Sequence, residues 1–192
     1  MINHALQFLL NSVLSFFLLA LLLRFYLQLF RLPFGNPVGR FLIALTDFAV
    51  RPARRVIPAF RKMDMATLVL AWGVSFVLLL TLSLLSPRGA MIFGRGFVFL
   101  SIAWLATVYL LRLSVYILMV AVVIQAVFSW VNPYHPLAPL LNGLTRPFLR
   151  PLQKRIPPIA NVDLSPLILL IACQVVLIVL VGWLESLAPR LF

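Results

Sequence analysis

Hydrophobic residues fill four long stretches of the chain, and prolines mark where these stretches end. The 14 prolines leave four proline-free windows, at residues 1–32, 59–86, 88–132 and 167–188. A proline inside a helix costs about 3 kcal/mol, so apolar windows without proline favour helices. Each window exceeds the roughly 20 residues that a helix needs to cross hydrocarbon. The pattern predicts transmembrane helices at residues 5–30, 65–86, 97–131 and 164–187.

The third of these helices is longer than a bilayer requires. It contains no Gly or Pro and only Arg112 interrupts it, and about 35 residues of helix measure about 50 Å. Two spans would need a turn, and turn residues are missing. The sequence predicts one long helix and leaves open whether residues 89–112 cross the membrane or lie at its surface. The N-terminal apolar run has no Lys or Arg before it and ends in Leu23-Arg24-Phe25 rather than in a small-residue cleavage site, which indicates a membrane helix rather than a signal peptide.

Composition supports an all-α membrane protein. Of the 192 residues, 64% are hydrophobic and only 10% are charged, whereas soluble domains carry about 25% charged residues. The chain has 16 Lys and Arg against four acidic residues, a formal net charge of +12. Seven basic residues lie in the loop 31–62 and four in the loop 131–162, both beside apolar stretches. This placement favours an anionic membrane surface as the partner and disfavours nucleic acid.

The basic residues also predict the topology. The two rich loops are expected in the cytoplasm, since short cytoplasmic loops carry an excess of Lys and Arg. The segment 87–96 holds two basic residues and the C-terminal tail one. Two spans between the rich loops place both on one side. We therefore expect a multi-pass protein of the inner (cytoplasmic) membrane with four spans and both termini outside.

The two halves of the chain resemble each other when one is shifted by 99 residues. The matching positions include Pro37 and Pro136, Leu45-Thr46 and Leu144-Thr145, Arg51-Pro52 and Arg150-Pro151, Arg55 and Lys154, and Asp64 and Asp163. Agreement over such a length predicts a duplication. It divides the chain into a first repeat at 1–86, a connecting segment at 87–99 and a second repeat at 100–192. Because both basic loops are expected on one side, the repeats are parallel, unlike the inverted repeats of many transporters.

Each basic loop shows two patterns in succession. Apolar residues first recur at helical spacing: Val38, Phe41, Leu42, Leu45, Phe48 and Ala49, then Leu137, Leu140, Leu141, Leu144 and Phe148. This spacing predicts a short amphipathic helix at the membrane interface in each loop. Basic residues bounded by prolines follow at 51–58 and 150–157. Because proline disfavours a continued helix, we expect these stretches to be extended and solvated.

These loops carry a resemblance to a known family. The segments LTDFAVRPARRVIPAFRKMD at 45–64 and LTRPFLRPLQKRIPPIANVDLSP at 144–166 resemble the paired signature of the YggT (YlmG) family. Gln153 replaces Arg54 in the second copy, and the first copy lacks the Asp-x-Ser-Pro ending. The resemblance implies an inner-membrane protein without an established activity. Members of the family that it resembles are associated with three different roles: osmotic-stress tolerance and ion uptake, organisation of the division site or nucleoid, and, in plastids, attachment of haem to a cytochrome b.

Asp64 and Asp163 are acidic residues in matching places. They would be ion ligands, or N-caps of the helices that follow them. A carboxylate at an N-cap accepts unpaired backbone N–H groups and meets the positive end of the helix dipole, so we favour caps. As caps they remain free to pair with Arg55 or Lys154.

The basic clusters have two readings. Arg51, Arg54, Arg55, Arg150, Lys154 and Arg155 would bind lipid phosphates or a protein partner, or would only determine topology. The neighbouring amphipathic helices favour headgroup contact slightly. For Arg24 and Arg112, inside apolar stretches, snorkelling to the interface is favoured over a functional role. Glu185 lies near a helix end and is expected to be solvated.

The remaining residues do not support enzyme chemistry. Cys173 is the single cysteine, and the two histidines are His4 and His135, so neither a metal nor a haem site is expected. No nucleophile–base pair or phosphate-binding glycine loop is recognisable. We expect no enzyme and no cofactor. The predicted function is a scaffold or assembly factor that binds anionic lipid and a protein partner, linked to osmotic stress; a homo-oligomer is one form of that partnership. The alternative is a small oligomeric channel or solute transporter.

Overall fold

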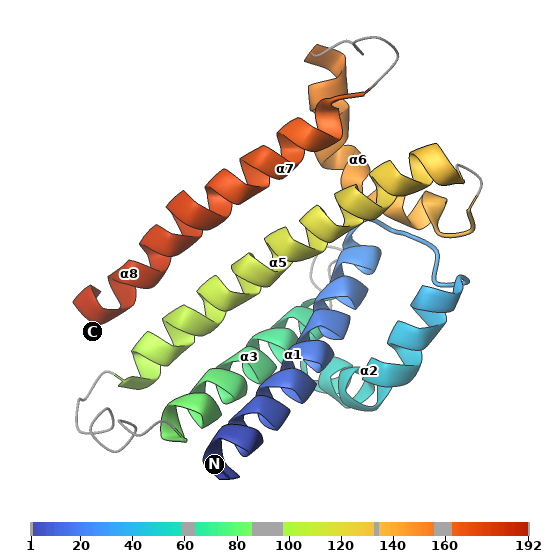
Figure 1. The fold of residues 1–192 in the computed structure, drawn as a ribbon. Helices are drawn as coiled ribbons and strands as arrows, with labels where there is room; N and C mark the ends of the chain where they lie inside the picture. Colours follow the sequence, from blue (N-terminus) through green and yellow to red (C-terminus); the bar gives the residue numbers. More distant parts are fainter. Residues whose placement is uncertain (1, 59–63, 86–97, 133–134, 156–162, 192) are drawn as a thin grey trace.

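A computed structural model describes residues 2–58, 64–85, 98–132, 135–155 and 163–191, and its regular elements over these residues are all helices (Figure 1). The first half of the chain forms α1 (Ile2–Leu29), α2 (Pro37–Val56) and α3 (Met65–Leu84). The second half forms α5 (Val98–Val131), α6 (Ala138–Arg155) and a final rod of α7 (Ser165–Val175), the π-helix η1 (Val176–Val181) and α8 (Gly182–Leu191). The all-α fold class is confirmed.

Four helices are long and apolar enough to cross a membrane. They are His4–Leu29, Met65–Leu84, Val98–Ser129 and Ser165–Ala188, with mean hydropathies between 2.2 and 2.9. The four predicted spans are thereby confirmed, and the third is one continuous helix as expected. Residues 98–112 belong to this helix, whereas the rest of the connecting segment, 87–97, lies outside the described residues.

The spans run side by side, and the two termini lie at the same end of the bundle (Figure 1). We call this end of the bundle the terminal end. The opposite end, where α3 and α7 begin, is called the loop end. α2 packs against α1 and α3, and α6 crosses the loop-end parts of α5 and α7. Each half thus has the same order of elements: a long helix, an amphipathic helix, and a return helix.

Matching positions of the two return helices pack against α5 at different heights. Ala71 of α3 packs in the same cluster as Leu110. Leu170 of α7, which lies 99 positions after Ala71, packs in the cluster of Val122. The two contact points are 12 residues apart along α5 (122 − 110), about 18 Å at 1.5 Å per residue. The final rod also reaches Val108 of α5, so the two return helices contact overlapping stretches of α5 while their matching positions are offset along it.

The π-helix keeps one face of the final rod on α5. The buried residues Ser165, Leu169, Cys173, Leu177 and Val181 recur every four positions. In an α-helix four residues turn about 400°, so a stripe with this spacing rotates by about 40° at each step. The wider π turn at Val176–Val181 counteracts this drift, and Val181 still packs against Val108 of α5. Nothing in the sequence pattern predicted this turn.

The basic stretches are helical, which corrects our expectation that they would be extended. α2 continues through Pro52 to Val56, and α6 continues through two prolines to Arg155. Val50 is fully buried and Leu149 is 2% exposed, and this packing offsets the hydrogen bonds that the prolines lack. The prolines themselves are exposed, so the carbonyl groups they leave unpaired face outward. Ile57, directly after α2, has an extended backbone; residues 156–157 lie outside the described residues.

Candidate functional site: charged clusters on the amphipathic helices

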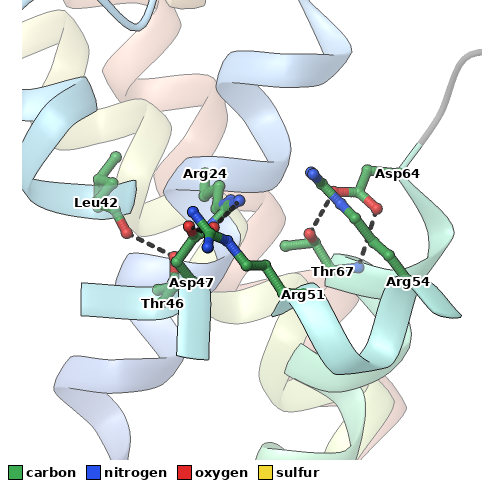
Figure 2. Close-up of polar contacts among 8 residues, drawn as sticks. All are labelled: Arg24, Leu42, Thr46, Asp47, Arg51, Arg54, Asp64 and Thr67. Carbon is green, nitrogen blue, oxygen red and sulfur yellow. Dashed lines mark hydrogen bonds and ion pairs between the residues drawn. The ribbon is translucent and has the colours of Figure 1, made fainter. Parts of the chain in front are cut away.

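An ion pair between a buried arginine and a partly exposed aspartate joins α1 to α2. The Nη2 atom of Arg24 lies 2.9 Å from a carboxylate oxygen of Asp47, and Nη1 donates to the Thr46 hydroxyl at 2.7 Å (Figure 2). Thr46 in turn donates to the Leu42 carbonyl at 2.5 Å. Arg51, one turn after Asp47, reaches its second carboxylate oxygen at 2.6 Å. Asp47 thus lies between two guanidinium groups, and the hydrogen bond from Arg24 lowers the pKa of its carboxyl group.

The prediction that Arg24 snorkels to the interface is wrong. The side chain is only 4% exposed, and its Nε has no hydrogen-bond partner. Snorkelling is unnecessary because α2 folds back against α1 and brings a carboxylate to the arginine. Sequence reasoning missed Asp47 because the matching position in the second half is Arg146, and Arg24 itself matches Val123. This ion pair therefore belongs to the first half.

A second charged cluster joins the end of α2 to the start of α3. Asp64 is the N-cap of α3: its carboxylate accepts the Thr67 N–H at 3.4 Å and the Thr67 hydroxyl at 2.6 Å. Arg54 donates to it from Nε at 3.2 Å and from Nη2 at 2.6 Å (Figure 2). In the amide orientation that matches donors to acceptors, Gln28 of α1 also donates to Asp64 at 2.6 Å. Burial raises the pKa of Asp64, but the hydrogen bonds from Arg54 and Thr67 outweigh burial and lower it overall.

The second half repeats this arrangement with a neutral partner. Asp163 accepts the Ser165 N–H at 2.9 Å and the side-chain amide of Gln153 at 2.8 Å. The N-cap position of α7 is Leu164, so Asp163 lies one residue earlier than predicted while still accepting a first-turn N–H. The predicted pairing with Arg55 or Lys154 is wrong, because the side chains that face the carboxylates are Arg54 and Gln153, one residue earlier on each helix.

Asp64→Ala is expected to destabilise the protein by about 1–2 kcal/mol, more than Asp163→Ala. The first variant loses a cap and leaves Arg54 without its carboxylate, whereas the second loses a cap and a neutral amide bond. Unfolding of detergent-solubilised protein in SDS, followed by tryptophan fluorescence, measures both. Equal losses would show that the Arg54 pair contributes nothing beyond capping.

The six predicted binding cations divide into two groups. Arg51 and Arg54 are used in the ion pairs above. The other four are exposed and form no ion pair within the described part of the chain: Arg55, Arg150, Lys154 and Arg155. Arg146, which was not singled out by sequence, joins this unpaired group.

A further ion pair lies between α5 and α8. Arg112 Nη2 is 2.6 Å from a carboxylate oxygen of Glu185, and both side chains are 33% exposed. About two turns before Arg112 on α5, the Trp104 indole donates to the Leu184 carbonyl at 2.9 Å. The expectation that Glu185 is simply solvated is therefore wrong, and Arg112 has a partner that helical periodicity within one span did not reveal.

The described residues contain no group of three metal-ligating side chains. Hollows between the helices are largely apolar: one of about 230 Å³ is lined by residues including Tyr26, Phe30 and Phe148, and one of about 250 Å³ by residues including Leu19, Val120 and Leu140. A smaller one of about 150 Å³ includes Gln125, whose amide contacts the Thr145 hydroxyl. The two larger of these spaces lie where the two halves meet, and the third lies within the second half.

Comparison with known proteins identifies the family. A model of the CCB3/YggT family matches residues 3–85 and 104–184. The chain belongs to the CCB3/YggT family. The uncharacterized protein PA0392 of Pseudomonas aeruginosa is similar to it, with 33% identity over 178 residues, which cover 91% of this chain and 87% of the relative. The uncharacterized protein YggT of Escherichia coli K12 is 31% identical over 175 residues, 90% of this chain and 87% of the relative.

A third family member of similar length is the uncharacterized protein in the proC 3′ region of Vibrio alginolyticus, 29% identical over 172 residues, 89% of this chain and 90% of that protein. No solved structure matches the chain. The CCB3/YggT relatives thus place the chain in a family without assigning it an activity.

Proposed function

We propose that the protein is a non-enzymatic scaffold of the inner membrane, which binds anionic lipid and a protein partner through α2 and α6 on the cytoplasmic side. The observation that carries this proposal is the pair of amphipathic helices, each with one buried face and one basic face, held against apolar spans. α2 buries Leu42, Thr46 and Val50 and exposes Arg40 and Arg55, which form no ion pair among the described residues. Such a helix suits the boundary between headgroups and acyl chains.

The exposed aromatic side chains of α2 support a position in this boundary. Phe41 and Phe48 are 54% and 72% exposed. Their rings lie 6.5 Å and 5.5 Å from those of Phe16 and Phe17, which belong to the apolar span α1. Covering such exposed phenylalanines beside an apolar span with acyl chains is energetically favourable. The arginines on the same helix then lie at headgroup height.

The channel alternative has less support. The larger hollows between the described helices are lined almost wholly by apolar side chains, so they offer little to replace the hydration shell of an ion. A role in osmotic-stress tolerance rests on the family resemblance, and growth of a deletion strain at high osmolarity tests it. Passage of ions or solutes through reconstituted protein would favour the channel.

Lipid preference tests the scaffold directly. Purified protein, offered equal amounts of phosphatidylglycerol and phosphatidylcholine in mixed micelles, should retain the anionic lipid in several-fold excess, as detected by native mass spectrometry. The preference should weaken as salt rises, because exposed charges are screened. Equal retention of both lipids would contradict the lipid half of the proposal. Crosslinking in native membranes that finds no stable neighbour would contradict the partner half.

A further inference from the structure

The two amphipathic helices have similar sequences but different charge balances. We propose that the cation row of α6 is the main binding site for the phosphate groups of anionic lipid, while Arg51 and Arg54 of α2 hold the first half of the protein together. Among the described residues of α2, Arg40 and Arg55 are the exposed cations without an ion pair, against four such cations on α6. This proposal rests on the lipid half of the proposed function and assigns it mainly to one helix.

Two of the three predicted-site arginines of α2, Arg51 and Arg54, are already occupied, whereas Arg55 is exposed and forms no ion pair among the described residues. Arg51 donates to Asp47 at 2.6 Å, and Arg54 holds Asp64 through two nitrogens. A guanidinium group with a carboxylate partner offers fewer free N–H groups and less net charge to a phosphate. Both carboxylates also contact other elements, Asp47 through Arg24 of α1 and Asp64 through the start of α3. Binding a phosphate at these arginines would compete with the contacts that fix α2.

In α6 the same two positions have changed. Arg146 stands at the position of Asp47, and Gln153 at that of Arg54. The first change replaces an acidic residue with a cation, and the second removes the arginine that would hold the following aspartate. As a result α6 contains four cations and no acidic residue, and within the described residues none of the four forms an ion pair.

The free cations of α6 lie in a row. Arg146, Arg150 and Lys154 follow one another at four-residue intervals, about 6 Å per step along the helix, and all are exposed. They face away from the buried Leu141 and Leu144, which pack toward the spans. Arg155 adds a fourth charge at the end of the helix. A row with this spacing presents several N–H donors to neighbouring headgroups, and arginine binds phosphate in a bidentate manner.

The surroundings of α6 identify lipid as the occupant. The parts of α5 and α7 nearest to α6 still expose apolar side chains. Val127 and Val131 on α5 are 50% and 77% exposed, and Leu167 on α7 is 57% exposed. Acyl chains are expected to cover this surface. Since α6 crosses the spans where that surface ends (Figure 1), its cations lie at the height of the lipid phosphates.

Two matched double variants test the division of roles. Arg150→Gln with Lys154→Gln removes two free cations from α6, and Arg51→Gln with Arg54→Gln removes two paired cations from α2. The α6 variant should bind phosphatidylglycerol at least about tenfold more weakly, since each near-surface cation contributes about fivefold, with an unchanged melting temperature. The α2 variant should melt at a lower temperature yet bind phosphatidylglycerol within about twofold of the wild type. Native mass spectrometry and thermal unfolding in detergent give the two readouts.

If the α2 double variant does not fold, the single variants Arg51→Gln and Arg150→Gln occupy matching exposed positions and replace the pair. The division of roles would be overturned if the α2 and α6 variants lost phosphatidylglycerol binding to the same extent, or if the α6 variant lost none, provided that the wild type prefers phosphatidylglycerol. A wild type without that preference would instead overturn the lipid half of the proposed function. Unchanged lipid binding by the α6 variant, with loss of a crosslinked acidic protein, would assign the row to a protein partner and overturn the proposal.

Discussion

Asp47→Asn is expected to lower the free energy of unfolding by about 3–5 kcal/mol, the largest effect of any conservative change in the amphipathic helices. The substitution leaves Arg24, which is 4% exposed, without a carboxylate and beside a second cation, Arg51. A buried arginine that loses its counter-charge keeps the cost of desolvation without the attraction that offsets it. SDS unfolding followed by tryptophan fluorescence, with the α1–α2 contact reported by hydrogen exchange, measures the loss.

Two controls separate the buried charge from other causes. Arg51→Gln removes the exposed partner of the same aspartate, whose side chain is 77% exposed, and should cost less than about 1 kcal/mol. Arg24→Met combined with Asp47→Leu removes both charges and should restore most of the stability, because an apolar pair avoids desolvation altogether. If the double variant is as unstable as Asp47→Asn, the loss comes from packing and the electrostatic explanation fails.

The same pair predicts an acid-sensitive first half. The pKa of Asp47 is lowered in the folded protein, so its stabilising effect is complete above the carboxyl pKa of the unfolded chain and is lost as pH falls through the lower folded value. Loss of stability below about pH 4 should therefore be shallower in Arg24→Met with Asp47→Leu than in the wild type.

Glu185→Ala is expected to cost about 2–3 kcal/mol and to loosen α8 from α5. Arg112 lies 14 residues into α5, and an unpaired arginine inside an apolar span costs about 2.5–3.5 kcal/mol at its centre. Its 33% exposure reduces this figure. The measurement is SDS unfolding of the reconstituted or detergent-solubilised protein, with a cysteine placed in α8 to report its release.

A combined Arg112→Leu and Glu185→Leu variant provides the control, since it removes both charges from the span. It should be about as stable as the wild type. If Glu185→Ala alone has no effect, Arg112 reaches polar surroundings without a partner, and the snorkelling expected from the sequence would describe it correctly after all. The stability of Glu185→Ala, compared with that of the double variant, therefore separates the two outcomes.

Much of this fold was readable from the order of residues. Hydrophobicity and the absence of proline located the four spans to within a few residues, because a helix in hydrocarbon must satisfy its backbone hydrogen bonds internally and expose apolar side chains. The spacing of Leu42 and Leu45, and of Leu141 and Leu144, likewise located the two amphipathic helices. These features depend on residues close together in the chain, which is why local patterns sufficed.

The charged contacts depended on tertiary structure. Arg24 and Asp47 are 23 residues apart, Arg112 and Glu185 are 73 apart, and no local period relates them. Proline at 52, 147 and 151 pointed to an extended backbone, but burial on one face of α2 and α6 kept both helices intact. Sequence alone determined which segments enter the membrane and which carry the positive charge. Only the folded chain decided which charges neutralise each other, because an ion pair forms where packing brings two distant segments within a few ångströms.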